Sequence, residues 1–143
     1  TKTQANELLG KADIVKMNDE ELALIGEWLG ISGTEKSQLE YIKKEFSLDL
    51  VILTKGRHGA ACLDETGYYE QPGFRVKVQD TIGSGDSFLA AFLSRFLKGG
   101  STPDCLVFAS AVGALVATKQ GGTPKIESPE IVTIMNSQSF QQT

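Results

Sequence analysis

The stretch Asp80-Thr-Ile-Gly-Ser-Gly-Asp86 lies between a predicted strand and a predicted helix, and it carries the strongest signal in the chain. Before it, Arg75-Val-Lys-Val-Gln79 alternates polar and apolar residues, which predicts a half-exposed strand. After it, phenylalanines recur every fourth residue from Asp86 to about Lys98, which predicts a helix with a broad apolar stripe. The two glycines allow a tight turn with bare N–H groups, and the helix start adds partial positive charge. The stretch therefore predicts a strand–loop–helix unit that can hold an anion.

Asp86 stands at the mouth of this predicted anion site. A carboxylate beside an anion is electrostatically unfavourable, so we expect it to have a chemical role, that of taking a proton. The alternative is that Asp86 merely caps the helix while the glycines make the turn. Other readings of the loop fail: a dinucleotide fingerprint would need glycine in place of Phe88, and no P-loop occurs. Serine hydrolase chemistry would need His58, the only histidine, and the nucleophile elbow is absent.

The remaining elements follow an alternating order. Several segments have apolar residues at helical spacing, which predicts helices. Continuous runs of β-branched residues instead indicate buried strands. Strands, helices and a hairpin in this order predict an α/β fold with a mostly parallel sheet flanked by helices, and ligands on such sheets bind beyond the carboxyl ends of the strands. The expected elements are a strand at 13–18, a helix at Asp19–Leu29, a Thr34-capped helix to about Phe46, a strand at Leu50–Thr54, hairpin strands at Ala60–Leu63 and Tyr68–Glu70, a Thr102-capped buried helix at about Asp104–Lys119, a helix at Pro129–Met135 and a fraying polar tail at 136–143.

Composition narrows the class of protein. The chain has 143 residues, 14 basic and 18 acidic side chains and a net charge of −4, which argues against a dedicated nucleic-acid binder. The most apolar stretch, Cys105 to Ala117, is too short to cross a membrane. Two isolated cysteines fit neither a disulfide framework nor a zinc site, so we expect a reduced, cytoplasmic protein. The N-terminal residues 1–10 resemble the middle of a helix and lack an initiator methionine, which suggests a piece of a longer protein.

Three motifs in this chain resemble those of one enzyme family. Asp80-Thr-Ile-Gly-Ser-Gly-Asp-Ser-Phe88 is similar to the D-T-x-G-[AS]-G-D-x-F signature of the ribokinase-like (PfkB-type) carbohydrate kinases. Asn18-Asp-Glu-Glu21 resembles the family's N-x-x-E motif, and Thr54-Lys-Gly-Arg-His-Gly59 resembles its T-x-G-x-x-G nucleotide loop. The three follow one another in the family's order. The resemblance implies a ribokinase-like three-layer α/β/α fold, of which residues 1–143 form the C-terminal nucleotide-binding and catalytic portion.

The resemblance implies a role for each residue of the signature. Asp86 would be the general base that removes a proton from a sugar hydroxyl, which then attacks the γ-phosphorus of ATP. Gly83, Ser84 and Gly85, with the amide of Asp86, would form the anion hole for the transferred phosphoryl group. These donors belong to the backbone, so we expect Ser84 to be needed for its small size and to tolerate alanine.

The same resemblance places the nucleotide along several other segments. Thr54, Gly56 and Gly59 would line the nucleotide side, and an ordinary strand-to-hairpin turn is their alternative. Ser110, in the predicted buried helix, would contribute a polar contact to the adenine site. Lys55 and His58 are left without a role.

Metal ions are implied in two places. Asn18 and Glu21 resemble the pair that organises Mg²⁺ and phosphate through water, although an isolated N-x-x-E is usually a capping box. Many relatives use a monovalent cation beside the anion hole. Asp80 and the carbonyl of Ile82 match part of that K⁺ site, and the remainder would lie within 117–122.

Substrate identity is open because the sugar-binding residues and the lid belong to the family's N-terminal half, which nothing here resembles. The resemblance favours a fructokinase-like sugar kinase, with ribose, a deoxy-keto sugar acid or a nucleoside as alternative substrates. It implies sugar and ATP as partners, no nucleic acid or membrane, and leaves a homodimer open for the full-length protein. A noncatalytic nucleotide-binding or regulatory domain and a dinucleotide-binding oxidoreductase are the competing functions. We expect the isolated fragment to bind nucleotide weakly and to catalyse little.

Overall fold

The computed structural model describes residues 13–81, 83–119 and 128–141, and the chain divides into two compact units. The first unit contains Thr1–Lys55 and Ala61–Tyr69, and the second contains Gly56–Ala60 and Glu70–Thr143. Within the described residues, no helix has the length and apolar character needed to span a bilayer.

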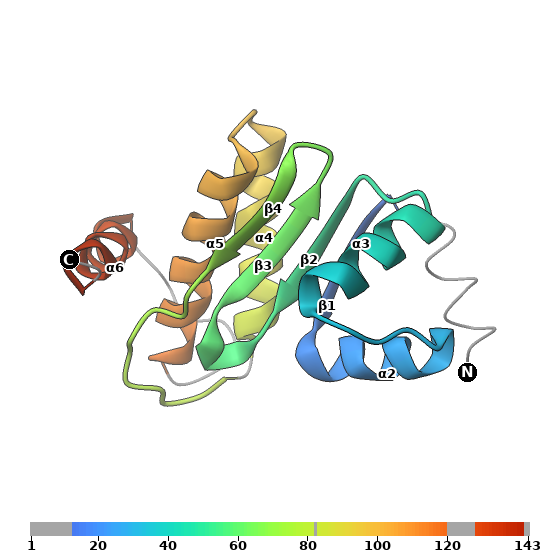
Figure 1. Cartoon of the computed structure of the whole chain (residues 1–143). Helices are drawn as coiled ribbons and strands as arrows, with labels where there is room; N and C mark the ends of the chain where they lie inside the picture. The colour runs from blue at the N-terminus through green and yellow to red at the C-terminus, as the bar shows by residue number, and fades with distance from the viewer. Residues whose placement is uncertain (1–12, 82, 120–127, 142–143) are drawn as a thin grey trace. The chain divides into compact units, whose positions relative to one another are not determined.

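A four-stranded sheet in the order β1-β2-β3-β4 is formed by Ile14–Asn18, Leu50–Thr54, Ala60–Asp64 and Gly67–Gln71 (Figure 1). β1 and β2 are parallel, as expected. The link 55–59 between β2 and β3 is much shorter than the roughly dozen residues that a parallel crossover needs, so β3 runs antiparallel to β2. The tight β3–β4 turn makes the expected hairpin. The sheet is therefore mixed, within an α/β fold of alternating strands and helices.

The first unit is held together by one apolar cluster between the sheet and two helices. Helices α2 (Asp19–Leu29) and α3 (Glu35–Glu45) lie beside β1 and β2 in Figure 1 and contact these strands. β2 has four consecutive buried residues, as expected of a central strand covered on both faces. The buried members of the cluster are Met17, Leu22, Leu39, Ile42, Leu48, Val51, Leu53, Ala61 and Leu63.

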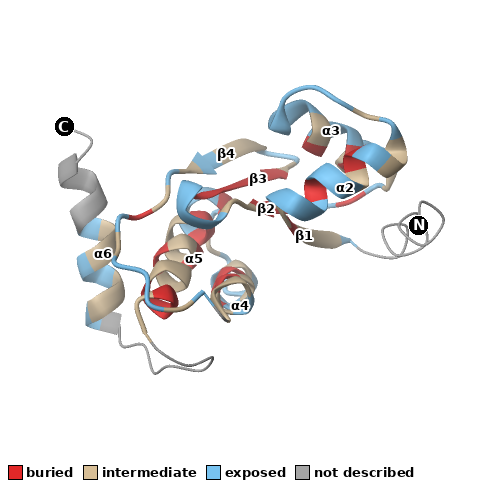
Figure 2. Ribbon diagram, turned by 90° about the horizontal axis from the view of Figure 1, so that it is seen from below, coloured by how far each residue is buried: buried red, intermediate tan, exposed pale blue. Residues whose placement is uncertain are grey.

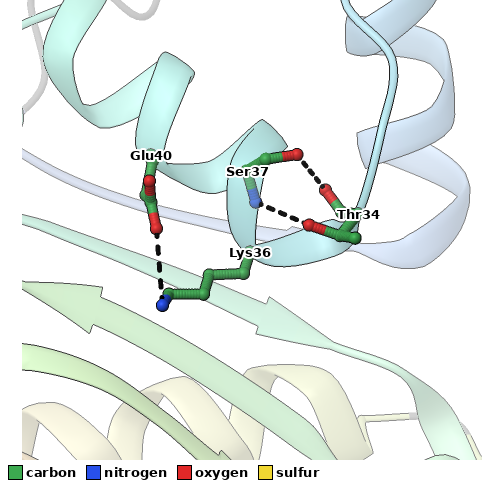
Figure 3. Close-up of polar contacts among 4 residues, drawn as sticks. All are labelled: Thr34, Lys36, Ser37 and Glu40. Atoms are coloured by element: carbon green, nitrogen blue, oxygen red, sulfur yellow. Dashed lines mark hydrogen bonds and ion pairs between the residues drawn. The ribbon is translucent and has the colours of Figure 1, made fainter.

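Two hydrogen bonds between Thr34 and Ser37 define the start of α3. The Thr34 hydroxyl oxygen accepts a hydrogen bond from the Ser37 N–H (3.1 Å), and the Ser37 hydroxyl donates to the Thr34 carbonyl (2.9 Å) (Figure 3). Lys36 and Glu40 form an exposed ion pair one turn apart, with 3.8 Å between Nζ and Oε1. The cap confirms the sequence prediction, whereas the ion pair contributes little because both side chains are solvated.

An antiparallel helix pair forms the core of the second unit. The N-terminal turn of α4 (Ser84–Leu97) approaches Gly113, late in α5 (Thr102–Ala117). At the other end of α4, the Arg95 guanidinium lies 4.0 Å from the ring centre of Phe108. α5 is buried along much of its length, as Figure 2 shows, which the all-round apolar sequence predicted. α6 (Ser128–Gln141) contacts α5.

The strand expected at 75–79 does not form. Its residues are irregular and join no strand of the described sheet, although Phe74 just before them is buried. The N–H groups of Gln79 and Asp80 instead donate to the carbonyl of Ala117, at 2.7 and 3.1 Å. Polar–apolar alternation indicates which side chains can be covered, but a strand also requires a neighbouring ladder, and alternation alone does not supply one.

Three helix ends also differ from the sequence prediction. α4 begins at Ser84 rather than Asp86, because Gly83 adopts a left-handed conformation (φ 80°) and serves as its N-cap. Ser101, not Thr102, caps α5: its hydroxyl accepts from the Asp104 N–H at 3.4 Å. α6 continues to Gln141, beyond the expected end at Met135, so the polar tail is mostly helical backbone. The expected helix at residues 1–10 lies outside the described residues.

Candidate active site

Two predicted site residues meet at the carboxyl ends of the parallel strands. Asn18 ends β1 and Thr54 ends β2, and the strand register places them opposite each other. The Thr54 hydroxyl is directed toward the carbonyl of Met17, at 3.5 Å. The carboxyl edge of a parallel sheet is where α/β proteins bind ligands, so this arrangement satisfies the spatial requirement of the sequence prediction.

Asn18 and Glu21 form a complete capping box at the start of α2. The Glu21 N–H donates to Asn18 Oδ1 (2.7 Å), and the Asn18 N–H donates to Glu21 Oε1 (3.0 Å). This is the structural role that sequence reasoning held open for the pair. It leaves the Asn18 amide group and the second Glu21 carboxylate oxygen facing a half-exposed to exposed surface. The capping role is therefore compatible with a water-mediated contact to a metal or phosphate.

Lys55, which follows β2, forms an ion pair with Glu35 of α3. Its ammonium lies 3.3 Å from Glu35 Oε2, and only 18 % of the Lys55 side chain is exposed. The Lys55 side chain is thus largely shielded from water, which strengthens the ion pair relative to one between two exposed side chains. The contact ties the beginning of the T-x-G-x-x-G segment to the first turn of α3, and it gives Lys55 a structural partner that the sequence did not reveal.

The two glycines of that segment lie in different environments. A single 3₁₀ turn, Gly56–His58 (η1), follows β2, and its first residue, Gly56, is exposed with open space where a Cβ would stand. Gly59 is buried, with φ at +104°. A Cβ there would overlap the carbonyl of Gln71 and lie 2.7 Å from the nitrogen of Gly73. Gly56 is thus accessible to a ligand, whereas Gly59 packs against the backbone of residues 71–73. His58 is an exposed member of the same turn, as expected.

The glycine-rich signature forms a tight turn against the N-terminus of α4. Both the N–H and the hydroxyl of Ser84 donate to the carbonyl of Thr81, at 3.2 and 2.8 Å. The Ser87 N–H donates to the carbonyl of Gly83 (2.9 Å). The amides of Gly85 and Asp86 lie between these two in the first helical turn, where N–H groups have no intrahelical acceptor and carry the positive end of the helix dipole. The turn has the form of an anion site.

Asp86 lies in this first turn and makes no side-chain hydrogen bond that caps the helix. The residue is exposed, and no hydrogen bond or ion pair joins its carboxylate to any residue in 13–81, 83–119 or 128–141. The N-cap of α4 is Gly83, and the helix has no side-chain cap. The alternative that Asp86 caps the helix is therefore not realised in this structure.

The structure describes only part of the K⁺ site that the sequence implies. Asp80 is half-buried, and Ile82 lies outside the described residues. The carbonyl of Ala117 already accepts the N–H groups of Gln79 and Asp80, which occupies both of its lone pairs. Within the described residues, no group of three or more His, Cys, Asp or Glu side chains could hold a metal ion.

Ser110 lies on α5 with its hydroxyl buried and without a hydrogen-bond partner among the described residues. An unsatisfied buried hydroxyl costs free energy, and because this oxygen is buried, a ligand can bond to it only after neighbouring atoms move. Gly113, one turn further along α5, would carry a Cβ 3.4 Å from the Ser84 carbonyl and 3.6 Å from Phe88 Cβ. A Cβ at Gly113 would thus lie in ordinary van der Waals contact with the start of α4.

The predicted residues thus form two groups. Within the first unit, Asn18, Glu21 and Thr54 gather at the carboxyl edge of β1 and β2. The second unit contains Gly56, Gly59, Asp80, Gly83, Ser84, Gly85, Asp86 and Ser110. Sequence reasoning missed Glu35 and Gly73, which contact Lys55 and Arg57. Of the two, only Gly73 carries a sequence signal, the Pro72-Gly73 dipeptide, which is typical of a turn.

Comparison with known proteins supports the motif resemblance. A model of the pfkB family of carbohydrate kinases matches residues 1–129. The chain is 36 % identical over 115 residues to an ATP-dependent ribose-1-phosphate kinase of Halopiger xanaduensis, covering 80 % of this chain and 36 % of that protein. It is 34 % identical over 137 residues to a protein of Arabidopsis thaliana named probable fructokinase-5, covering 90 % and 41 %.

Structural comparison gives the same fold. A crystal structure from E. coli described as a ribokinase II, in complex with ATP and Mg²⁺, matches with a TM-score of 0.81 and 23 % identity, covering 94 % of this chain and 42 % of that one. The chain therefore has the α/β fold of ribokinase-like proteins, as predicted, and it spans about two fifths of the length of the proteins that it matches.

Proposed function

This chain belongs to the pfkB family of carbohydrate kinases, and we propose that it forms the C-terminal, nucleotide-binding and catalytic part of a kinase that transfers the γ-phosphoryl group of ATP to a sugar hydroxyl. The observation that carries the proposal is the Asp86 carboxylate, exposed and unpartnered among the described residues beside the glycine-rich turn at the start of α4. This carboxylate makes no capping hydrogen bond, and the proposed reaction needs a proton acceptor beside the glycine-rich turn.

In the proposed reaction, Asp86 accepts the proton of the sugar hydroxyl as that oxygen attacks the γ-phosphorus. An ordinary carboxylate is a weak base, but the hydroxyl becomes acidic as the new O–P bond forms, so correct positioning is sufficient. The backbone amides of Gly83, Gly85 and Asp86 present the anion hole, whereas the N–H and the hydroxyl of Ser84 both donate to the Thr81 carbonyl and hold that turn in shape before the substrate arrives.

The proposal assigns several residues to nucleotide binding. Thr54 and Gly56 offer a hydroxyl and an unobstructed backbone, and Gly59 supports the turn that presents them. The unsatisfied Ser110 hydroxyl supplies a polar contact near the adenine. Lys55 is paired with Glu35, so we assign it no phosphate contact.

The residues present fit Mg²⁺ in a limited way. The second oxygen of Glu21 and the side-chain amide of Asn18 remain after the capping box is formed, which suits contacts through water to an ion that keeps much of its hydration shell. When bound with ATP, Mg²⁺ neutralises charge on the phosphates. K⁺ stays a prediction resting on Asp80 and Ile82; the carbonyl of Ala117 is already used by two amides.

Among substrates we favour fructose, with ribose, a deoxy-keto sugar acid or a nucleoside as alternatives. The two relatives named above are called a ribose-1-phosphate kinase and a probable fructokinase, which supports a sugar acceptor without choosing one. We expect the 143 residues by themselves to bind MgATP weakly and to transfer little phosphate, because sugar contacts come from other parts of the family's domain. The cytoplasmic location inferred from composition stays a prediction.

The proposal is tested with the intact kinase that contains this segment, assayed with MgATP against fructose, ribose, a deoxy-keto sugar acid and nucleosides. We expect ADP release that depends on one of these acceptors. Binding of ATP with no transfer to any acceptor would instead identify a nucleotide-binding regulatory domain, and binding of NADH in preference to ATP would contradict the kinase assignment. Sugar phosphorylation by the 143-residue chain at the rate of the intact enzyme would refute its assignment as an incomplete catalytic part.

A further inference from the structure

Two segments of the second unit cross at backbone contact distance. One is the nucleotide turn, Gly56–Gly59, and the other is the segment Gln71–Gly73, which follows β4. Gly59 is buried against all three residues of the second segment: a Cβ there would overlap the Gln71 carbonyl and lie 2.8 Å from the carbonyl carbon of Pro72. Real Cβ atoms essentially never come so close to backbone, so only glycine fits at this position.

Gly73 makes the reciprocal contact. A Cβ at Gly73 would overlap the carbonyl oxygen of Arg57 and lie 2.7 Å from its carbon and 3.1 Å from the nitrogen of Gly59. The φ angle of Gly73 lies outside the left-handed range, so its backbone conformation is open to any residue. The obstacle to a side chain at Gly73 is therefore the nucleotide turn itself. Because the opposing atoms are backbone, they can give way only if the turn moves.

The turn has little else to hold it from outside. Gly56, Arg57 and His58 are exposed, and a Cβ at Gly56 would meet nothing within 4 Å. Within the turn, the Gly59 N–H donates to the Gly56 carbonyl at 3.2 Å. The position of the Arg57 peptide therefore depends on its contact with the backbone of Gly73.

We infer that Gly73 is a positioning residue for nucleotide binding. Because it has no side chain, its backbone contacts the Arg57 carbonyl directly, and this contact determines the position of the Gly56–Gly59 turn relative to the nucleotide. The inference rests on the proposed function, since it assigns Gly73 to the same nucleotide site. It predicts that any side chain at Gly73 lifts the turn and weakens ATP binding, although Gly73 itself touches no ligand.

The test compares MgATP binding by the intact kinase and by its Gly73→Ala variant, using calorimetric titration. We expect the Kd for MgATP to rise at least fivefold in Gly73→Ala. In the intact kinase the same substitution is expected to raise the KM for ATP while leaving the KM for sugar within about twofold. A merely structural defect would lower the amount of active enzyme and leave both KM values unchanged.

Gly99→Ala is the matched control. Gly99 lies in the same unit just after α4, has φ at +87° and has open space around its Cβ position, so alanine strains the backbone without pressing on a neighbour. We expect this variant to lose stability but to keep the wild-type Kd for MgATP. A folded Gly73→Ala chain with a Kd within twofold of wild type would overturn the inference. Absence of MgATP binding by the intact wild-type kinase would overturn the proposed function, and the inference with it.

A measurement on the unmodified chain decides the matter if Gly73→Ala does not fold. On titration with MgATP, the amide NMR resonances of Gly73 and of Gly56–Gly59 should shift together with one Kd, while that of Gly99 stays still. Shifts confined to Gly56–Gly59, with Gly73 unmoved, would show that the two segments are not coupled and would refute the inference.

Discussion

Asn18 and Thr54 face each other at the carboxyl ends of the parallel strands β1 and β2. The two residues come from motifs separated by two helices in the sequence, and the strand register alone brings them together. Asn18 also begins α2, so one side chain both ends a strand and caps the next helix. The first unit therefore gathers its polar groups at the edge where a parallel sheet binds ligands.

The two roles assigned to Asn18 can be separated by substitution. Asn18→Ala removes the cap of α2 and should lower the free energy of unfolding by about 1 kcal/mol. Asn18→Asp keeps the cap oxygen and should keep the stability, but its added charge beside the phosphates should raise the Kd for MgATP about fivefold. Urea denaturation and calorimetric titration measure the two effects. Thr34→Ala, which removes the cap of α3, should lose similar stability with an unchanged Kd. An unchanged Kd in Asn18→Asp would argue against a phosphate-side role for Asn18.

Ser84 gives a prediction that the structure refines. Its hydroxyl donates to the Thr81 carbonyl, but its N–H donates to the same oxygen, so the turn survives without the hydroxyl. Ser84→Ala should cost about 1 kcal/mol of stability and leave kcat within about threefold, because the anion hole is made of backbone. Thr118→Ala, which removes a similar hydroxyl-to-carbonyl bond at the end of α5, is the control. A hundredfold loss of kcat in Ser84→Ala alone would mean that the hydroxyl takes part in the reaction.

Gly113 lies where α5 contacts the start of α4. Alanine fits there, since its Cβ would lie in ordinary contact with the Ser84 carbonyl and Phe88. Gly113→Ala should therefore be neutral or should stabilise the helix by up to about 1 kcal/mol. Gly113→Leu should displace the start of α4, costing about 1–3 kcal/mol and most of the activity. Equal stability of the two variants in urea denaturation would show that the helices are not closely packed at this point.

The cysteines provide a test of packing in each unit. Cys62 and Cys105 are both fully buried. Burial raises the pKa of the Cys105 thiol, and the neighbouring Asp104 carboxylate adds to the effect. Because the folded pKa is the higher one, this stabilisation is complete below the ordinary thiol pKa and is lost as the pH rises through the folded pKa. We expect neither thiol to react with a disulfide reagent in the folded chain at neutral pH, and both to react in denaturant. Rapid labelling of Cys105 without denaturant would show that α5 is not packed as described.

Local signals in the sequence were sufficient for several elements. The acids that begin α2 and the glycine that ends it predicted Asp19–Leu29 correctly, and the unbroken apolar run predicted Leu50–Thr54. The strand expected at 75–79 failed because a strand depends on a partner that alternation does not reveal. Likewise, the Lys55–Glu35 pair and the contact of Gly73 with Arg57 join residues distant in the sequence. The motifs predict which residues form the site, but they do not reveal the contacts that Glu35 and Gly73 make with Lys55 and Arg57.

The central claim is that Asp86 accepts the proton of the attacking hydroxyl. Its most direct test is the turnover of the intact kinase carrying Asp86→Asn, a change that keeps size and removes the proton acceptor. Asp104→Asn is the control, because Asp104 is also an exposed acid in the first turn of a helix. The account predicts that Asp86→Asn lowers kcat by about 100- to 10,000-fold with the Kd for MgATP within about twofold, while Asp104→Asn has wild-type turnover. A kcat for Asp86→Asn within a few-fold of wild type would contradict it.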